Sequence, residues 1–339
     1  MAGKGGWRRA GSRRRGFRYY DARGREIADD AKLERIAALR IPPAWRDVWI
    51  SPRPTAKLQA TGLDAAGRKQ YLYHADYRAA QEQAKFDKLV RFAEALPGFR
   101  EAMAEHMTFE PMTREWTSAV AVRLINLAWF RVGEERYAKE HKTFGITTLR
   151  KSHVSVRGSR IAFRFRGKHG IWVRTAVVDS ELAEAMKVLI GKRGGRRLFC
   201  YQQDGDTYSL NARRLNEYIS EFMGEEFTAK DFRTWGGTLV AAIALAERGP
   251  VETQTEAKRV VAAVMRTVGE RLGNTAAVAR SSYVSPAVVE QYLDGRTIED
   301  FRPRHLRVVG ARDLGLDREE QALVSLLRSW RIRRARKAA

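Results

Sequence analysis

The stretch IAFRFRGKHGIWVRTA, residues 161–176, is a short β segment inside a part of the chain that otherwise has helical spacing. Apolar and polar residues alternate over 161–165, residues 167–170 (GKHG) supply a turn, and a second alternating run follows. This pattern predicts a β-hairpin with Lys168 at its tip. With helices on both sides of it, the hairpin indicates an α+β fold.

Helical patterns precede and follow this hairpin. From about residue 81 apolar side chains recur every three or four residues, for example at Trp116, Val120 and Leu124. Capping residues predict where later helices begin and end, with starts at Thr228, Thr253 and Ser285 and an end at Gly273. A last helix is expected at about 318–330. We therefore predict a mainly helical domain over residues 81–327.

The region before residue 81 has a different pattern. Four short alternating runs are separated by turn residues and predict strands at 18–20, 47–50, 57–60 and 70–73. A helix at about 30–39 interrupts them, and the Pro-Pro pair at 42–43 ends it. Residues 17–80 are thus expected to form a small β-rich domain. Residues 1–16 and 328–339 are expected to be basic tails, the first of them disordered.

The charge of the chain points to a polyanionic partner. Its 63 Lys and Arg against 40 Asp and Glu give a formal net charge of +23, of which residues 1–25 and 328–339 carry +14. The remaining +9 belongs to the body of the chain. Because 44% of the residues are hydrophobic, the chain can bury a substantial core, so the charge does not indicate wholesale disorder.

Several kinds of site are absent from the sequence. Cys200 is the single cysteine, and the six histidines are scattered without metal-ligand spacing, so we expect no disulfide framework and no metal site. There is no P-loop and no Gly-x-Ser-x-Gly elbow, which argues against ATP hydrolysis and acyl transfer. No run of about 18 apolar residues and no secretory signal is present. We therefore expect a soluble, intracellular protein.

Four residues stand in unusual surroundings, and each also has an ordinary structural explanation. Arg131 follows an apolar run and could be a cation at a helix end. Lys168 could be a solubilising lysine at the hairpin tip. Arg233, in KDFRTWGG, could pair with Asp231 or Glu247. Tyr283 could be a core residue beside its neighbour Val284.

These four residues together suggest one reaction, phosphoryl transfer from a phosphodiester. A tyrosine hydroxyl can attack a phosphodiester, and arginines can replace a metal in stabilising the negative charge that spreads over the non-bridging oxygens. Because the ordinary pKa of tyrosine is near 10, neighbouring arginines would also favour the phenolate. A lysine at a mobile hairpin tip can reach and protonate the leaving oxygen.

The same segments resemble those of a known family. Residues 123–154, RLINLAWFRVGEERYAKEHKTFGITTLRKSHV, look like the first catalytic-arginine segment of type IB DNA topoisomerases of the poxvirus-like, bacterial branch. RGKHG, KDFRTWGG and LGNTAAVARSSYVSP follow in the order and spacing of the family. RIPPAWRDVWI and LQATGLDAAGRKQYLYH in the N-terminal region also resemble this branch. The resemblance covers about residues 17–300.

The resemblance implies a fold, a reaction and a partner. It implies a β-rich N-terminal domain and a helical catalytic domain that close as a monomeric clamp around double-stranded DNA. Tyr283 would form a 3′-phosphotyrosyl link, the free strand would rotate, and its 5′-hydroxyl would reseal the break. The link conserves the energy of the phosphodiester, so neither ATP nor an obligatory divalent metal is implied, and no cofactor is expected. A cytoplasmic, nucleoid-associated protein would fit this activity.

The resemblance also implies roles for individual residues. Arg131 and Arg233 would bind the non-bridging oxygens, and Lys168 would be the main acid for the 5′-oxygen. Asn274 stands where viral members have histidine, and its amide can donate a hydrogen bond but cannot exchange a proton near neutral pH. DNA contacts would come from Gln70, Tyr71 and Tyr73 in the N-terminal domain and from Tyr137 and Lys230 in the catalytic domain.

Two other functions are compatible with parts of the sequence. A tyrosine recombinase or integrase shares the Arg, Lys, Arg and Tyr chemistry, although RVGEERY and KTFGITTL match the topoisomerase pattern better, and the N-terminal half does not resemble a helical core-binding domain. A non-catalytic, basic DNA-binding or nucleoid protein would need only the charge. Composition alone does not reject this second alternative.

Overall fold

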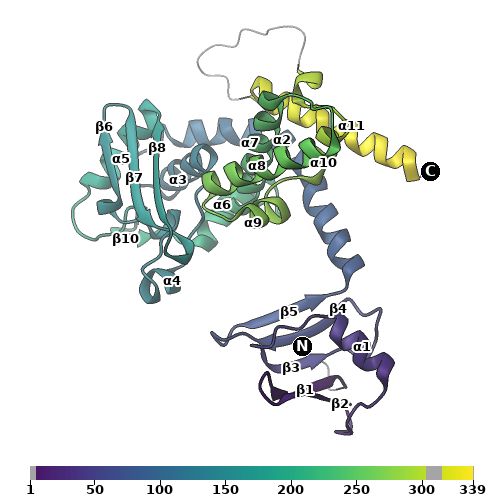
Figure 1. The fold of residues 1–339 in the computed structure, drawn as a ribbon. Coiled ribbons are helices and arrows are strands. Elements are labelled where there is room, and N and C mark those ends of the chain that lie inside the picture. Colours follow the sequence, from purple (N-terminus) through teal and green to yellow (C-terminus); the bar gives the residue numbers. More distant parts are fainter. Residues whose placement is uncertain (1–4, 303–314, 339) are drawn as a thin grey trace. The chain divides into compact units, whose positions relative to one another are not determined.

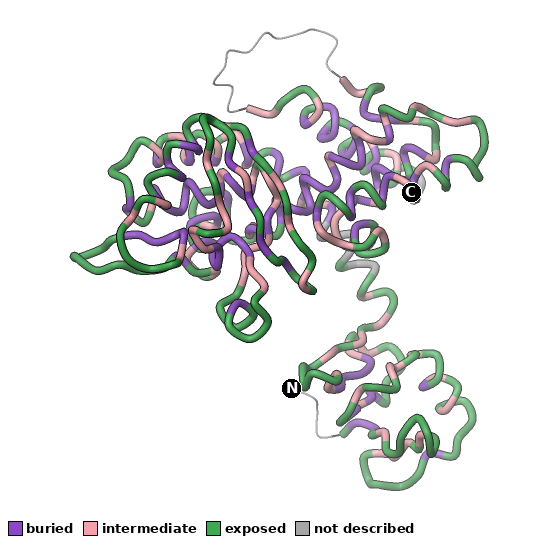
Figure 2. Tube along the Cα trace, turned by 60° about the vertical axis from the view of Figure 1, so that its left-hand side comes forward, coloured by how far each residue is buried: buried purple, intermediate pink, exposed green. Residues whose placement is uncertain are grey.

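The computed structural model describes residues 5–302 and 315–338. The chain divides into two compact units, residues 1–86 and 87–339, each with buried residues at its own centre (Figures 1 and 2). The division falls inside the long helix α2 (Ala75–His106), close to the boundary expected from the change in sequence pattern. None of the helices in the described part of the chain is both long and apolar enough to cross a membrane.

The N-terminal unit is an antiparallel five-stranded sheet with one helix. Its strand order is β2-β1-β3-β4-β5, and α1 (Asp30–Ala38) lies against the sheet (Figure 1). The strands are β1 (Trp7–Ser12), β2 (Gly16–Tyr20), β3 (Arg46–Ile50), β4 (Leu58–Leu63) and β5 (Lys69–Tyr73). The small β-rich domain and its helix are therefore as the sequence predicts.

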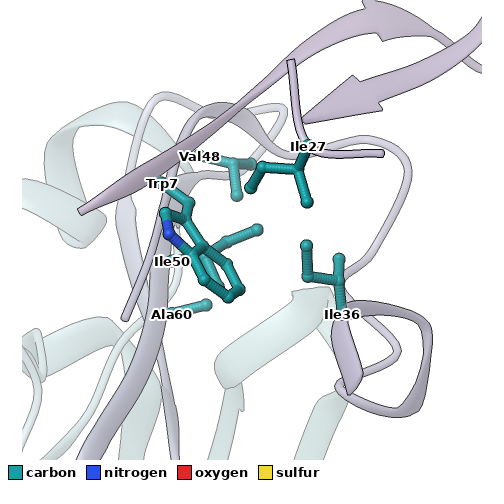
Figure 3. Close-up of a cluster of buried hydrophobic side chains, with 6 residues drawn as sticks. All are labelled: Trp7, Ile27, Ile36, Val48, Ile50 and Ala60. Carbon is teal, nitrogen blue, oxygen red and sulfur yellow. The ribbon is translucent and has the colours of Figure 1, made fainter. Parts of the chain in front are cut away.

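A compact apolar cluster holds this unit together. Ile36 of α1 points toward the side chains of the sheet, so that the helix covers one face of it (Figure 3). Arg35 of the same helix donates to the Ser51 carbonyl and to Oε1 of Gln59, both at 2.8 Å. The buried members of the cluster are Trp7, Ile27, Ile36, Val48, Ile50 and Ala60.

Strand β1 lies in the segment that we expected to be a disordered basic tail. Trp7 is only 8% exposed and pairs with Ile50, so the strand supplies part of the core. Arg9 is not merely a solvated charge, because its guanidinium donates to the backbone carbonyls of Pro42 (3.2 Å) and Trp45 (2.6 Å). The expectation of a disordered tail was wrong for residues 7–12. The count of basic residues does not show that an arginine such as Arg9 donates hydrogen bonds to the backbone of a loop.

The second unit joins a helical bundle to a small sheet (Figure 1). The predicted hairpin is formed by β7 and β8, joined by the 3-10 turn η3 (Lys168–Gly170), and β6 adds a third strand. These strands are β6 (Val154–Arg157), β7 (Arg160–Arg166) and β8 (Trp172–Val178), and a second hairpin consists of β9 (Cys200–Gln203) and β10 (Asp206–Ser209).

The helices of this unit begin and end close to the predicted positions. Thr228 and Asp231 form a capping box at the start of α7, Thr253 caps α8, Ser285 precedes Pro286 of α10, and Gly273 ends α8 with a φ of 62°. After α2 the helices are α3 (Arg114–Ala128), α4 (Glu135–Glu140), α5 (Ser180–Gly191), α6 (Ala212–Met223), α7 (Ala229–Arg248), α8 (Gln254–Leu272), α9 (Ala276–Ser282), α10 (Pro286–Leu293) and α11 (Arg318–Ala338).

The last helix is longer than predicted. We expected a helix to about residue 330 and a basic tail from 328, but α11 continues to Ala338. Trp330 is 8% exposed and its indole N–H donates to Glu290 of α10 at 2.7 Å, while Arg333 lies 3.2 Å from a carboxylate oxygen of Asp294. Part of the C-terminal charge is therefore used to attach α11 to α10. This attachment was not visible as a local sequence pattern.

The position of Trp7 in the core gives a test of the N-terminal strand. Replacing Trp7 by Ala should destabilise the N-terminal unit by about 3–5 kcal/mol, because it empties a large buried volume. Hydrogen exchange of the β3 amides in the full chain measures the effect. The matched control is Arg8→Ala, which removes an exposed side chain from the same strand. Equal protection in both variants would mean that residues 7–12 are not part of the folded unit.

Candidate active site

Arg233 is the most deeply buried of the predicted site residues. It lies on the first turns of α7 with 5% exposure. Its Nη2 donates to the carbonyl of Leu272 at 2.8 Å, and its Nη1 donates to the carbonyl of Trp129. Trp129 ends α3 in the left-handed conformation (φ 52°), and its carbonyl is free to accept this bond. Nε of Arg233 is buried without a hydrogen-bond partner in the described part of the chain.

Arg131 donates to the two residues that follow Leu272. Its Nη2 donates to the Gly273 carbonyl at 2.9 Å and to Oδ1 of Asn274 at 2.5 Å. The backbone of Arg131 is held in turn, because its carbonyl accepts from the Ile146 N–H at 2.8 Å. Arg233 therefore binds the last residue of α8, and Arg131 binds the short loop that follows it before α9. These hydrogen bonds bring Arg131 and Arg233, which are far apart in the sequence, to neighbouring backbone carbonyls.

No carboxylate of a described residue balances these two arginines. Among residues 5–302 and 315–338, neither Arg131 nor Arg233 forms an ion pair. Asp231, which the sequence offered as a partner for Arg233, instead lies 2.8 Å from Nζ of Lys88 and accepts from the Thr228 N–H. One buried and one half-buried guanidinium group thus keep positive charge that no carboxylate among the described residues neutralises. A buried charge of this kind favours the binding of an anion.

The loss of hydration lowers the pKa values of both arginines. Burial and, to a smaller extent, the charge of Arg233 lower the pKa of Arg131 to about 10, while Tyr283 acts in the opposite direction. Burial also lowers the pKa of Arg233. A pKa of about 10 still leaves Arg131 protonated near neutral pH. The pair therefore remains cationic under ordinary conditions.

Tyr283 lies against Arg233. The guanidinium carbon of Arg233 is 5.0 Å from the centre of the tyrosine ring. Burial by itself would raise the pKa of the Tyr283 hydroxyl, but the charges of Arg233, Arg131 and Lys230 outweigh it and hold this pKa below its ordinary value. Deprotonation, which a nucleophilic tyrosine needs, is thereby made easier. Tyr283 is the residue of the group in which covalent chemistry can start.

Helix α7 also fixes the backbone of Tyr283. Gly237, one turn after Arg233, lies so close that a Cβ there would be 2.9 Å from the Tyr283 carbonyl oxygen. The hydroxyl of the buried Thr238 is 3.1 Å from that same oxygen and accepts from the Ser285 N–H at 3.1 Å. One helix therefore positions both an arginine and the tyrosine segment.

Asn274 is part of the same arrangement. Its N–H donates to the Gly269 carbonyl at 2.7 Å, and a Cβ at Gly269 would be only 2.8 Å from the Asn274 carbonyl oxygen. The side-chain oxygen accepts from Arg131, which leaves the amide Nδ2 as its donor. The sequence prediction that Asn274 belongs to the site is consistent with this contact. Its role toward a substrate stays a prediction.

Lys168 lies apart from these residues. It is exposed in η3, and in the described part of the chain it forms no hydrogen bond or ion pair with Arg131, Arg233 or Tyr283. The hairpin is nevertheless coupled to the arginine segment, because the Phe144 N–H donates to the Arg166 carbonyl at 2.7 Å. The structure thus brings together four of the five predicted catalytic residues, and the catalytic roles of all five stay predictions.

The predicted DNA contacts of the N-terminal unit lie on two faces of β5. Tyr71 and Tyr73 are 48% and 40% exposed, and their rings stack with centres 6.2 Å apart. Gln70 points to the opposite face, where its amide donates to Asp64 at 2.9 Å. The resemblance implied that all three side chains contact DNA. The alternation of a β-strand separates the glutamine from the tyrosines.

The two predicted DNA contacts of the catalytic unit are both accessible. Tyr137 is 36% exposed on α4 and stacks on His141 with ring centres 5.9 Å apart. Lys230 is exposed on the first turn of α7, and its charge helps to lower the pKa of Tyr283. Lys230 is thus linked to the site electrostatically as well as by its position on α7.

Sequence reasoning missed Gly237 and Thr238. The signal for Gly237 was the pair Gly236-Gly237 inside a helical pattern, since glycine in a helix often marks a close approach of another segment. A Cβ at Gly236 would be 2.3 Å from the ring of Trp129. Thr238 carried no comparable signal.

In the described part of the chain, no three His, Cys, Asp or Glu side chains are grouped so that they could hold a metal ion.

Comparison with known proteins covers both units. Residues 74–301 match the family described as the catalytic core of eukaryotic DNA topoisomerase I, and residues 16–64 match the N-terminal domain of bacterial DNA topoisomerase IB. DNA topoisomerase 1B of Acanthamoeba polyphaga mimivirus is 35% identical over 285 residues, which are 81% of this chain and 84% of the relative. DNA topoisomerase 1B of Vaccinia virus (strain Copenhagen) is 20% identical over 78% of this chain and 83% of the relative.

A solved structure with a partial likeness is a XerH site-specific recombinase bound to its difH substrate in a pre-cleavage complex. It is 14% identical, covers 58% of this chain and 51% of its own, and has a TM-score of 0.36, which carries no conclusion. The two matching family descriptions and the 35% identity to the mimivirus enzyme over most of both chains are decisive. The chain belongs to the type IB DNA topoisomerase family.

Proposed function

We propose that the protein relaxes supercoiled double-stranded DNA by cutting and resealing one strand with Tyr283 as nucleophile. The observation that carries this proposal is the pair of the half-buried Arg131 and the buried Arg233, which lacks a carboxylate partner among the described residues and adjoins a tyrosine of lowered pKa. A phosphodiester supplies the missing negative charge. The same group of residues would be unnecessary in a protein that only binds DNA.

The first chemical step is attack on the scissile phosphorus. Oη of Tyr283 loses its proton and forms a bond to phosphorus, while the bond from phosphorus to the 5′-oxygen breaks. The products are a 3′-phosphotyrosyl link and a strand that ends in a 5′-hydroxyl. Rotation of this strand changes the linking number. Attack by the 5′-hydroxyl then reverses the chemistry and releases Tyr283.

The two arginines stabilise the charge that develops on the non-bridging oxygens. The unpartnered Nε of Arg233 is a buried donor whose hydrogen bond a phosphate oxygen can accept. Nη2 of Arg131 is occupied by Gly273 and Asn274, which leaves its other guanidinium nitrogens for the phosphate. Because both guanidinium groups are held by backbone carbonyls, little reorganisation is needed when the substrate binds.

Lys168 protonates the leaving 5′-oxygen in this proposal. Its exposed position on the tip of a hairpin allows it to move toward the bound strand, and catalytic contacts often tighten only in the complex with substrate. Asn274 assists by holding Arg131 and by donating from Nδ2 to a phosphate oxygen. Neither ATP nor an obligatory divalent metal takes part, because the phosphotyrosyl link conserves the energy of the broken bond.

The partner is duplex DNA, bound by a single copy of the chain that closes around it as a clamp. The net charge of +23 supports this choice, as do the exposed rings of Tyr71 and Tyr73 and the exposed side chains of Tyr137 and Lys230. Gln70 would join them only after leaving Asp64. In a cell the protein would act on DNA in the nucleoid.

Replacing Tyr283 by Phe tests the nucleophile. The ring beside Arg233 is retained, so duplex binding should be nearly unchanged, while relaxation and the covalent adduct should disappear. The assay is relaxation of a plasmid in EDTA without ATP, followed by denaturing capture of protein on a 3′ end. Tyr292→Phe, which removes a hydroxyl bonded to the Gly249 carbonyl, is the matched control and should stay active. Strand exchange that required a specific site, without general relaxation, would instead indicate a recombinase.

Replacing Arg131 or Arg233 by Ala tests the charge stabilisation. Each change should slow single-turnover cleavage by roughly 10³ to 10⁵, the range known for one charge-stabilising arginine in phosphoryl transfer. Lysine should restore only part of the rate, because it lacks the planar fork of donors. A matching loss of DNA affinity, with an unchanged rate at saturating enzyme, would assign the arginines to binding instead.

The pH dependence of cleavage tests the lowered pKa of Tyr283. The rate should rise with pH as the phenolate forms, and Lys230→Gln should move this rise to higher pH, because the loss of a positive charge raises the pKa of Tyr283. Single-turnover rates at saturating enzyme remove any effect on binding. Lys187→Gln on α5 is the control for an exposed lysine elsewhere. Identical pH profiles of the cleavage rate for the wild type, Lys230→Gln and Lys187→Gln would show that Lys230 does not act on the nucleophile.

A further inference from the structure

Helix α11 carries a buried carboxylate that is tied to the catalytic helix. Glu320 is 3% exposed and lies in the first turn of α11. Its Oε1 accepts from Nη2 of Arg100 (2.7 Å) and from the indole N–H of Trp235 (3.1 Å). Its Oε2 accepts from Nη1 of Arg100 (2.9 Å) and from the Asp317 N–H (3.1 Å). Helices α2, α7 and α11 therefore meet at one carboxylate.

This carboxylate uses its acceptor capacity fully. A carboxylate has about four lone-pair positions, and Glu320 receives four N–H donors. Asp317 completes the arrangement by accepting from the Glu320 N–H at 2.7 Å, which is a reciprocal cap at the start of α11. Arg100 neutralises the charge. A buried group satisfied in this way fixes the relative position of the three helices more narrowly than apolar packing does.

Trp235 transmits this constraint to the active site. It follows Arg233 by two residues, which places the two side chains about 200° apart around the axis of α7. Glu320 thus holds α7 on one side, and the carbonyls of Trp129 and Leu272 hold Arg233 on the other. A rotation of the helix that broke the first contact would also disturb the second.

Little rotation is tolerated at this part of α7. Gly236 contacts the ring of Trp129, and Gly237 contacts the Tyr283 carbonyl, so closely that neither position has room for a Cβ without a shift of its neighbour. The rotation of α7 therefore decides how Arg233 and the Tyr283 segment meet. Helix α11, which begins at Arg318, lies beyond residues 74–301 that match the catalytic core of the family.

We propose that Glu320 is a positioning residue for strand cleavage, which holds the indole of Trp235 and so fixes the rotation of α7 at which Arg233 meets Tyr283. This inference rests on the proposed function. In this proposal α11, which lies outside the matched catalytic core, helps to position Arg233 of the active site. Glu320 contacts neither the reacting atoms nor the DNA and acts only through Trp235.

The first test is Trp235→Phe, which keeps a ring in the core and leaves the pair of Glu320 and Arg100 intact. Loss of a hydrogen bond to a charged acceptor should slow single-turnover cleavage at saturating enzyme by about tenfold, with little change in duplex affinity. The matched control is Trp330→Phe, which removes an indole bond from α11 to Glu290 of α10 and should leave the rate nearly unchanged. Equal losses in both variants would overturn the proposal, because they would indicate general loosening of α11.

A double-mutant cycle shows whether the effect passes through Arg233. In an Arg233→Ala background, Trp235→Phe should have almost no further effect on the cleavage rate, because the residue that it positions is gone. Independent, multiplying losses would overturn the proposal. The pH profile is a second readout, since Arg233, Arg131 and Lys230 are the charges that lower the pKa of Tyr283. Trp235→Phe should move the rise of the rate to higher pH, and Trp330→Phe should not.

Glu320 itself supplies a third comparison. Glu320→Gln keeps a carbonyl oxygen that can accept from Trp235, so it should cleave DNA faster than Glu320→Ala, which leaves the indole without its acceptor. Equal rates in these two variants would overturn the proposal. The outcomes are separable from a failure of the proposed function. If wild-type protein forms no covalent adduct, the proposed function fails, whereas a wild type and a Trp235→Phe variant that cleave equally fast would reject only the role of Glu320.

Discussion

The catalytic unit depends on the hydrogen bonds of one buried guanidinium group. Arg233 joins α7 to the end of α3 through the Trp129 carbonyl and to the end of α8 through the Leu272 carbonyl. Backbone carbonyls can satisfy N–H donors without cancelling the charge, whereas a carboxylate would do both. The same residue therefore stabilises the fold while its positive charge has no carboxylate partner in the described part of the chain. A second arginine, Arg131, repeats the arrangement on the next residues of the loop.

Close backbone contacts allow this arrangement. Gly237 lets the Tyr283 carbonyl approach α7, and Gly269 lets the Asn274 backbone approach α8. Side chains at these positions would separate the arginines from the tyrosine. The closeness has an electrostatic consequence, since it brings the charges near enough to Tyr283 to outweigh the effect of burial on its pKa. Packing and reactivity are thus set by the same contacts.

The charge of the chain has several different uses. Arg9 and Arg35 donate to loop carbonyls in the N-terminal unit, Arg100 neutralises Glu320, and Arg333 attaches α11 to α10. These residues contribute to the net charge of +23 but serve the fold. Arg131 and Arg233 differ from them because they lie beside Tyr283 and their charges lower its pKa. Net charge indicates a class of partner, and the local environment of each arginine indicates its function.

The sequence by itself determined the fold class, the hairpin with Lys168, the helix caps at Thr228, Thr253 and Ser285, and the family, because these depend on local spacing and ordered motifs. It did not determine that β1 joins the N-terminal sheet or that α11 continues to Ala338. It also did not determine that the Gln70 amide is bound by Asp64 while Tyr71 is exposed on the opposite face of β5. Only the tertiary structure decided which backbone carbonyls hold Arg131 and Arg233 and that Glu320 reaches Trp235. The physical reason is that these contacts join residues 39 to 142 positions apart, and no local pattern specifies which distant donor and acceptor will meet.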